Sequence, residues 1–115
     1  MQISKRGEFN NPKKSPYNYE KYDSDLERRL MVRLETDQTV KKWMKRHGIT
    51  ITWIDGQKRM RRYVPDFLVE YTDNRKALIE VKDASRIDSD DVKRKRKAAE
   101  LWCKKRGMEY SVMTI

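Results

Sequence analysis

Residues 62–82 read RYVPDFLVEYTDNRKALIEVK, with two apolar runs on either side of a short polar segment. The runs at 67–71 and 77–81 are rich in β-branched and aromatic residues, and the polar residues between them are typical of a turn. This pattern predicts a β-hairpin. The rest of the chain can be interpreted as support for that hairpin.

Charged residues are uncommon inside such strands, yet Asp66, Glu80 and Lys82 all occur here. Because side chains alternate along a strand, Glu80 and Lys82 share one face. Folding the hairpin brings Asp66 opposite or beside Glu80 if the turn has three residues or if a bulge occurs near Pro65, since a two-residue turn would set Asp66 opposite Val81. Under that condition, two carboxylates and an ammonium group converge.

Paired carboxylates repel each other unless a cation lies between them, and oxygen ligands favour a hard ion such as Mg²⁺ over zinc. A metal held by Asp66 and Glu80 would offset the charge developing on a phosphorane-like transition state, while Lys82 would help to activate the attacking water. In the alternative interpretation, Glu80 and Lys82 form a solvent-exposed ion pair on an edge strand and Asp66 is a turn residue.

The Pro65-Asp66 and Glu80-Val81-Lys82 segments resemble the signature of the PD-(D/E)xK nuclease superfamily. Within it, residues 63–69 and 79–82 are most similar to the N-terminal nuclease domain of TnsA transposon endonucleases, and archaeal Holliday-junction resolvases are similar as well. The resemblance spans about residue 17 to the C-terminus. It implies an α/β fold with a restriction-endonuclease-like αβββαβ core, a mixed sheet flanked by helices, and the Val81 carbonyl as a further metal ligand.

The sequence departs from TnsA, which carries glutamine where Glu80 stands and has a further C-terminal domain for its transposase partners. We therefore expect a phage or mobile-element nuclease, acting with other proteins of a DNA-processing or packaging complex, rather than a transposition enzyme. The first functional hypothesis is a Mg²⁺-dependent DNA endonuclease, in which Mn²⁺ can substitute. The alternatives are a structure-specific Holliday-junction resolvase and a catalytically inactive DNA-binding subunit of the same fold. A homodimer is expected, because one such domain holds one active site.

The composition supports a nucleic-acid partner. Among 115 residues, 28 Lys and Arg against 18 Asp and Glu give a net charge of +10, which favours a polyanion such as DNA. No long apolar run, signal segment or lipidation motif is present, so we expect a soluble cytoplasmic protein without a membrane partner. The single Cys103 excludes an internal disulfide and, with only His47 as a companion, leaves no zinc site.

Residues 1–22 lack apolar periodicity and are predicted to form a basic extended arm, with a single nuclease-like domain at 23–115. Lys13 and Lys14 of this arm are candidate phosphate contacts. A disordered tail is the alternative.

A helix is predicted from Ser24 to about residue 35, with Glu27 inside its apolar stripe. Glu27 either caps Ser24 or projects at the carboxylate pair. The TnsA resemblance implies the second role, as a third acidic group, and Glu20 is the substitute for it. Thr36-Asp37 then predicts a second short helix over 38–46, with Trp43 in the core.

Residues 49–53 and the residues from Arg59 onward predict two strands around an Asp55-Gly56 turn, which form a meander with the hairpin. Arg59, Arg61 and Arg62 form a basic strip that leads into the Pro-Asp segment, with the solvated face of an edge strand as the alternative.

Asp83 to Arg86 is predicted to be a loop, followed by a helix from Asp88-Ser89 to Arg106 that ends at Gly107. Three of its basic residues are candidate DNA contacts: Lys93, Lys95 and Lys97. Lys95 falls within the apolar stripe, so it could also reach the site. Residues 108–115 alternate as a last strand, predicted to pair parallel with 77–82.

Overall fold

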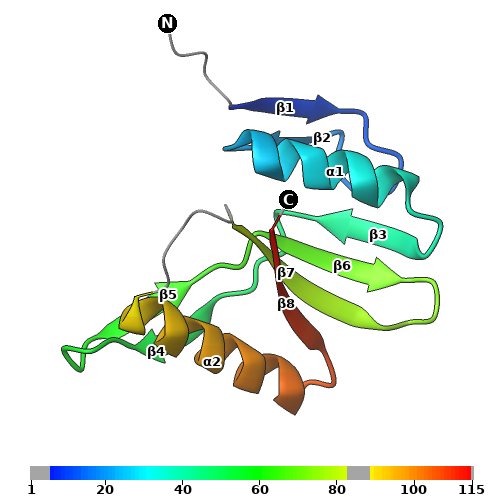
Figure 1. Ribbon diagram of the computed structural model, residues 1–115. Coiled ribbons are helices and arrows are strands. Elements are labelled where there is room, and N and C mark those ends of the chain that lie inside the picture. The colour runs from blue at the N-terminus through cyan, green and yellow to red at the C-terminus, as the bar shows by residue number, and fades with distance from the viewer. Residues whose placement is uncertain (1–5, 83–88, 115) are drawn as a thin grey trace, which may run out of the picture.

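The computed structural model describes residues 6–82 and 89–114, which form two helices and eight strands (Figure 1). In chain order these are β1 (Gly7–Asn10), β2 (Tyr19–Tyr22), α1 (Asp25–Thr36), β3 (Val40–Met44), β4 (Ile51–Ile54), β5 (Met60–Tyr63), β6 (Phe67–Tyr71), β7 (Lys76–Lys82), α2 (Asp90–Lys105) and β8 (Glu109–Thr114). Four strands form a central sheet in the order β3-β6-β7-β8, while β1–β2 and β4–β5 are separate two-stranded ribbons. The predicted mixed α/β fold is confirmed.

The central hairpin has the three-residue turn that the site requires. β6 and β7 are antiparallel with Phe67 opposite Ile79 and Glu70 opposite Lys76. The Tyr71 N–H donates to the Arg75 carbonyl at 2.8 Å, so the loop consists of residues 72–74. Asn74 in this loop has φ 72°, a left-handed conformation that asparagine tolerates better than most residues.

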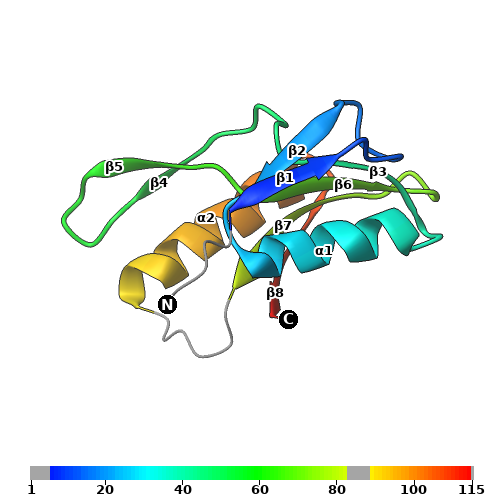
Figure 2. The same cartoon turned by 90° about the horizontal axis from the view of Figure 1, so that it is seen from above.

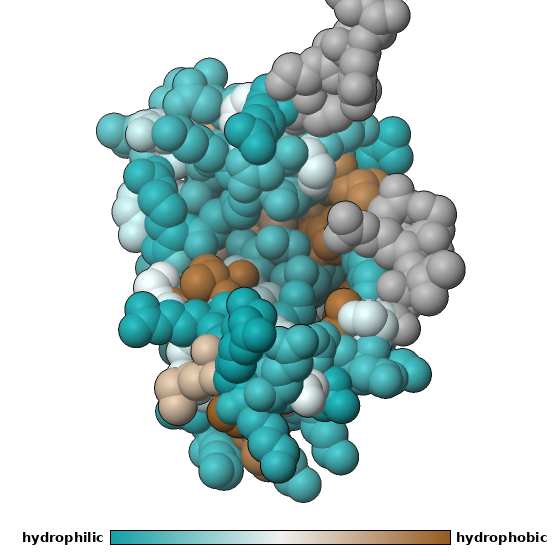
Figure 3. Space-filling view, turned by 90° about the vertical axis from the view of Figure 1, so that its left-hand side faces the viewer, coloured by the Kyte–Doolittle hydropathy of each residue, from teal (hydrophilic) through white to brown (hydrophobic). Residues whose placement is uncertain are grey.

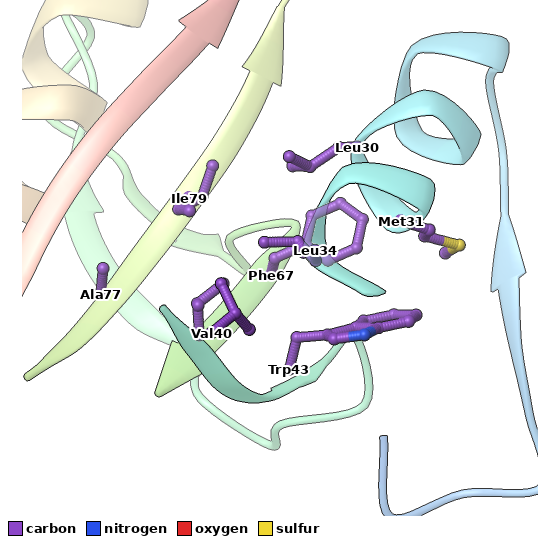
Figure 4. Packing of buried hydrophobic residues seen from close by; sticks show 9 residues of the cluster. Leu30, Met31, Leu34, Val40, Trp43, Phe67, Ala77 and Ile79 are labelled. Carbon is purple, nitrogen blue, oxygen red and sulfur yellow. The ribbon is translucent and has the colours of Figure 1, made fainter. Parts of the chain in front are cut away.

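The two helices cover opposite faces of the central sheet (Figures 1 and 2). On one face, α1 packs Leu30, Met31 and Leu34 against β3, β6 and β7 (Figure 4). On the other face, α2 contributes Ala99 and Cys103 to a second cluster with Leu78 of β7 and with residues of the β4–β5 ribbon. The central strands are therefore buried on both sides, as their continuous apolar runs indicate.

Two of the three predicted helices, α1 and α2, begin and end close to the expected residues. Ser24 caps α1 by accepting a hydrogen bond from the Glu27 N–H, and Ser89 caps α2 by accepting one from the Val92 N–H. The α2 helix ends before Gly107, whose φ of +67° is readily adopted only without a side chain. β8 then pairs parallel with β7, as predicted. Asp88 and the predicted loop at 83–86 lie outside the described residues.

The predicted helix at 38–46 is wrong, because these residues contain β3. Val40 and Trp43 are both buried, and their spacing of three residues is typical of a helix. β3 achieves the same spacing with a register shift between Val40 and Lys42, where an extra residue returns both apolar side chains to one face. Antiparallel pairing of β3 with β6 decides the conformation.

The predicted meander is also wrong. β4 and β5 pair with each other, but neither belongs to the central sheet, because the edge of β6 that faces away from β7 is occupied by β3. Between β5 and β6 lie Val64 and Pro65, and proline cannot donate a hydrogen bond to a ladder. The chain changes direction there, so the ribbon continues over the α2 side of the sheet (Figure 2).

The predicted N-terminal arm includes the β1–β2 hairpin. Phe9 of β1 packs edge-on against Trp43, with ring centroids 6.1 Å apart. The backbone N–H groups of Lys13 and Lys14 donate to the two carboxylate oxygens of Glu35 at 2.7 and 2.9 Å. The described part of residues 1–22 is therefore attached to the core.

Candidate active site

Asp66 and Glu80 come together at the end of the β6–β7 ladder. Extending the register of Phe67 opposite Ile79 by one residue sets Asp66 directly opposite Glu80. The Oδ2 atom of Asp66 accepts a hydrogen bond of 2.9 Å from the Val81 N–H. The carboxylate pair predicted from the sequence thus lies on neighbouring strands, with a backbone amide holding one member in place.

Pro65 explains why a side chain takes that amide. In the same register, Pro65 would lie opposite Val81, where a ladder strand would exchange two backbone hydrogen bonds. Proline has no N–H to donate to the Val81 carbonyl, and the Pro65 carbonyl instead contacts Nε2 of His47 at 2.7 Å. The Asp66 side chain therefore takes the place of the Pro65 carbonyl as the acceptor for the Val81 N–H. The Val81 carbonyl receives no backbone hydrogen bond from Pro65.

His47 is a residue of the site that the sequence did not indicate. Its Nδ1 accepts a hydrogen bond of 2.9 Å from the Ile49 N–H, which leaves Nε2 as the protonated nitrogen that donates to Pro65. The imidazole thereby fixes the carbonyl of the residue preceding Asp66.

Glu27 approaches the pair from α1. Its Oε1 accepts a hydrogen bond of 3.0 Å from the Asp23 N–H and pairs with Nζ of Lys45. The capping contact is therefore made to Asp23 rather than to Ser24. The substitute, Glu20, is fully buried, and its two carboxylate oxygens accept hydrogen bonds from the Ser15 hydroxyl at 2.6 Å and from the Lys45 N–H at 3.4 Å.

Lys45 is a second site residue that sequence reasoning missed. The side chains of Lys45 and Glu27 are only 16% and 12% exposed, so their ion pair is largely shielded from water. Lys45 also lies 5.9 Å from the ring centroid of Phe67, the residue after Asp66. No local pattern marks Lys45, because it follows a strand whose place in the sheet was not predicted.

The electrostatics of the cluster raise the pKa of Asp66 to about 7. Burial is the main cause, and the negative charges of Glu80 and Glu27 add to it. The Val81 N–H and the Lys45 ammonium oppose this effect without cancelling it. Asp66 therefore gives up its proton less readily than an exposed aspartate does, because its charged form is buried beside two other carboxylates.

Two tyrosines connect Glu80 to the α2 side of the sheet. The Tyr63 hydroxyl donates to Oε1 of Glu80 at 2.7 Å and contacts the Tyr110 hydroxyl at 2.9 Å. Burial and the charge of Glu80 raise the pKa of Tyr63 far above its ordinary value, and burial raises that of Tyr110 to about 12. Both phenols therefore stay protonated and can act as hydrogen-bond donors. Tyr63 stands two residues before Pro65 in the sequence, but no local pattern identified Glu80 as its partner.

Lys82 lies beside this network. A small cavity of 80 Å³ is lined by Glu80, Lys82 and Tyr110 together with the basic residues Lys95 and Arg96 of α2. Nζ of Lys95 lies 4.7 Å from the centroid of the Tyr63 ring. The structure thus brings Lys95 to the cavity from the apolar stripe of α2, while its contact with phosphate stays a prediction.

The other predicted DNA contacts differ in their surroundings. The Arg61 guanidinium binds Asp55 at 2.8 Å, and Nζ of Lys14 donates to the Asp37 carbonyl at 2.6 Å. The remaining members of the set have exposed side chains: Lys13, Arg59, Arg62, Lys93 and Lys97. These five have the accessibility that phosphate contacts need.

The donor set fits a magnesium ion. Within residues 6–82 and 89–114, no three His, Cys, Asp or Glu side chains converge as a complete ligand cluster. Mg²⁺ requires less than that, because it keeps several waters and is typically bound by one or two carboxylates plus substrate phosphate. Asp66, Glu80 and the Val81 carbonyl offer oxygen donors of this kind, and the pKa of Asp66 is raised mainly by burial, with the charge of Glu80 adding to the effect.

Comparison with known protein families agrees with this geometry. Residues 37–115 match the model of the TnsA-like endonuclease N-terminal domain. The chain belongs to this family. Membership in the TnsA-like endonuclease family supports a nuclease function, with DNA as substrate and a divalent metal as the general requirement of such a domain. The matched region contains Asp66, Glu80 and Lys82 but not Glu27.

Two further observations concern the chain as a whole. No curated protein matches it. Neither helix of the described residues is both long and apolar enough to cross a membrane.

Proposed function

We propose that this TnsA-like domain is a metal-dependent DNA endonuclease that hydrolyses a phosphodiester bond to a 5′-phosphate and a 3′-hydroxyl. The observation that supports it most directly is the position of Asp66 opposite Glu80, with the pKa of Asp66 raised to about 7. Burying charged carboxylates side by side is costly, and carboxyl groups with strongly perturbed pKa values cluster at functional sites.

The proposed metal is Mg²⁺, for which Mn²⁺ can substitute, held by Asp66, Glu80 and the Val81 carbonyl. When bound, such an ion supplies Lewis-acid stabilisation of the charge that develops on the phosphate. The protein's own residues set the geometry. The Val81 N–H orients Asp66, and the Tyr63 hydroxyl orients Glu80.

Lys82 is proposed to assist the attacking water. It follows Glu80 by two residues on β7, so both side chains project from the same face of the strand, and both line the cavity beside α2. An ammonium group there can orient a water molecule and lower the cost of forming hydroxide. Lys95 and Arg96 line the same cavity and are proposed to hold the phosphates next to the scissile one.

Glu27 is proposed to complete the acidic set. Its charge contributes to the raised pKa of Asp66, and its pairing with Lys45 keeps that ammonium within the cluster. Glu27 thus acts on the metal-binding pair through charge and through the placement of Lys45.

The biological setting is proposed as a phage or mobile-element DNA-processing complex in the cytoplasm. One domain carries one site, so cutting both strands requires two protomers, and we propose a homodimer with DNA as the common partner.

Cleavage of supercoiled plasmid tests the proposal. The protein with Mg²⁺ or Mn²⁺ should produce nicked or linear DNA, and Asp66→Asn or Lys82→Ala should abolish the product. Lys41→Ala is the matched control, because Lys41 is an exposed lysine on β3 whose partner is Glu70, 3.8 Å away. Loss of activity in this control would contradict the assignment.

Two further measurements separate the proposal from its alternatives. A wild-type protein that binds DNA but cuts neither duplex nor branched substrates in either metal would be a binding subunit. Faster cleavage of a four-way junction than of linear duplex, with the same metal, would indicate a resolvase. Metal binding itself is read from a rise in melting temperature with Mg²⁺, which Asp66→Asn should remove.

A further inference from the structure

The β4–β5 ribbon has one face that packs on the protein and one that does not. Its register sets Ile51 opposite Tyr63 and Thr52 opposite Arg62. Residues directly opposite each other share a face, and faces alternate along each strand. Ile51 and Tyr63 are buried in the cluster beneath α2, so the face of the ribbon that contains Arg62 points outward.

The outer face combines apolar and basic groups. We define it by its two cross-strand pairs: Thr52 with Arg62, and Ile54 with Met60. Ile54 is 51% exposed and Met60 is 73% exposed, although both are large apolar side chains next to each other at the end of the ribbon. Adjacent exposed apolar residues surrounded by polar groups mark interaction sites more often than single ones do.

The neighbouring Arg61 shows that the two faces have different roles. Arg61 lies opposite Trp53, and its guanidinium is held by Asp55 at 2.8 Å. Asp55 also accepts hydrogen bonds from the N–H groups of Gln57 and Arg59, at 2.8 and 2.9 Å. Arg61 therefore stabilises the turn, whereas Arg62 extends from the outer face.

We propose that the outer face of the β4–β5 ribbon enters the major groove of duplex DNA and reads base edges there. This inference rests on the proposed nuclease function and names its substrate as double-stranded. A major groove about 12 Å wide accepts a two-stranded ribbon, whose strands lie about 4.8 Å apart before side chains are added, whereas a minor groove about 6 Å wide does not.

The side chains of this face match the chemistry of that groove. An arginine binds guanine through O6 and N7, a threonine hydroxyl can bond to several base edges, and apolar side chains contact the methyl group of thymine. Arg62, Thr52 and the Ile54–Met60 pair supply these three kinds of contact. The net charge of +10 provides the sequence-independent attraction that brings the ribbon to DNA.

The ribbon is also coupled to the proposed chemistry. Tyr63, at the end of β5, donates a hydrogen bond to Glu80, and Asp66 follows three residues later. The ribbon projects beside α2 in Figure 2, and Figure 3 shows the side on which it projects as mostly hydrophilic with small apolar patches. The inner face of the ribbon thus contacts the carboxylate pair through Tyr63, while the outer face is free to contact DNA.

Protein variants test the groove contact by fluorescence anisotropy, with the full chain, EDTA and a labelled duplex of mixed sequence. Arg62→Ala and the double variant Ile54→Ser/Met60→Ser should each weaken duplex binding about tenfold, which is the size of effect expected when a contact with a base edge is lost. Neither variant should change the affinity for single-stranded DNA. The matched controls are Arg33→Ala and Val32→Ser, exposed positions on α1, which should bind duplex as wild type does. Equal effects at the ribbon and at α1 would overturn the proposal.

A change in the DNA tests the same contact with wild-type protein. Deoxyuridine in place of thymidine removes the methyl group from the major groove and leaves base pairing intact, so wild type should bind the uracil duplex several-fold more weakly. In Ile54→Ser/Met60→Ser, that difference should disappear. Unchanged wild-type affinity for uracil DNA would overturn the reading of thymine methyl groups. Failure of wild type to bind any duplex would instead refute the proposed function.

Discussion

The hydroxyl of Tyr63 donates a hydrogen bond of 2.7 Å to Oε1 of Glu80 and meets the Tyr110 hydroxyl at 2.9 Å. This contact joins the ribbon to the carboxylate pair. It also gives Glu80 a neutral donor that stays protonated over the working pH range, because the pKa of Tyr63 is raised by burial and by the charge of Glu80.

Tyr63→Phe should therefore lower the cleavage rate with little change in DNA affinity. Loss of a hydrogen bond that orients a catalytic carboxylate is expected to cost about 1.5 kcal/mol, or roughly tenfold in kcat. Single-turnover cleavage at saturating protein measures this, and Tyr110→Phe, one bond further from Glu80, should have a smaller effect. A tyrosine that only fills space would give wild-type kcat when replaced by phenylalanine.

Lys45→Met should destabilise the folded protein, because it leaves the Glu27 carboxylate unpaired where its side chain is only 12% exposed. Breaking a buried ion pair costs about 3 kcal/mol, measurable by urea unfolding. The double variant Glu27→Gln/Lys45→Met should recover part of this loss, since no unpaired charge remains and the glutamine oxygen can still accept the Asp23 N–H. If the double variant were less stable than Lys45→Met alone, charge pairing would not explain the contact.

Asp66 should make the stability of the metal-free protein fall as the pH rises. Its folded-state pKa is about 7, whereas an unfolded aspartate titrates near 4, so the folded state binds the extra proton between these values. The contribution of this proton to the free energy of unfolding is thus fully present below about pH 4. It is lost progressively as the pH rises to about 7.

Asp66→Asn is neutral at every pH and can still accept the Val81 N–H. Its melting temperature should exceed that of wild type by several degrees at pH 8 in EDTA, since about 1 kcal/mol shifts the melting temperature of a small domain by roughly 4 °C or more. At pH 4 the two proteins should differ much less. An equal difference in melting temperature at both pH values would show that burial and neighbouring charge do not raise the pKa of Asp66.

Phe9→Ala should destabilise the protein by about 2 kcal/mol, because the half-buried ring packs edge-on against Trp43 in the core. Urea unfolding followed by tryptophan fluorescence measures the change. Glu8→Ala, at the exposed neighbouring position, is the control and should be neutral. An unchanged midpoint in Phe9→Ala would mean that the β1–β2 hairpin is a separate arm rather than part of the domain.

Some features of the fold could be predicted because they depend on near neighbours in the chain. The alternation in residues 62–82 indicated the hairpin, and the parity condition correctly required a three-residue turn for Asp66 to meet Glu80. Ser24 and Gly107 marked helix ends because capping and positive φ are local properties.

The errors arose where pairing between distant segments changed a local pattern. Val40 and Trp43 have helical spacing, but a bulge lets a strand bury both of them. The ribbon around Asp55-Gly56 was recognised, while its exclusion from the central sheet was not, because that depends on β3 occupying the edge of β6.

By itself, the sequence determined the central hairpin, the approximate limits of α1 and α2 and the net positive charge, since spacing and charge are written along the chain. It made the meeting of Asp66 with Glu80 conditional on a three-residue turn or a bulge, and the structure has the three-residue turn. Only the tertiary structure decided that Lys45, Tyr63 and His47 surround that pair and that Arg62 faces outward while Arg61 binds Asp55. Most of these contacts join segments that lie 17 or 18 residues apart in the chain, and the contact of Arg61 with Asp55 depends on the register of the β4–β5 ribbon, so packing and register decide which side chains meet.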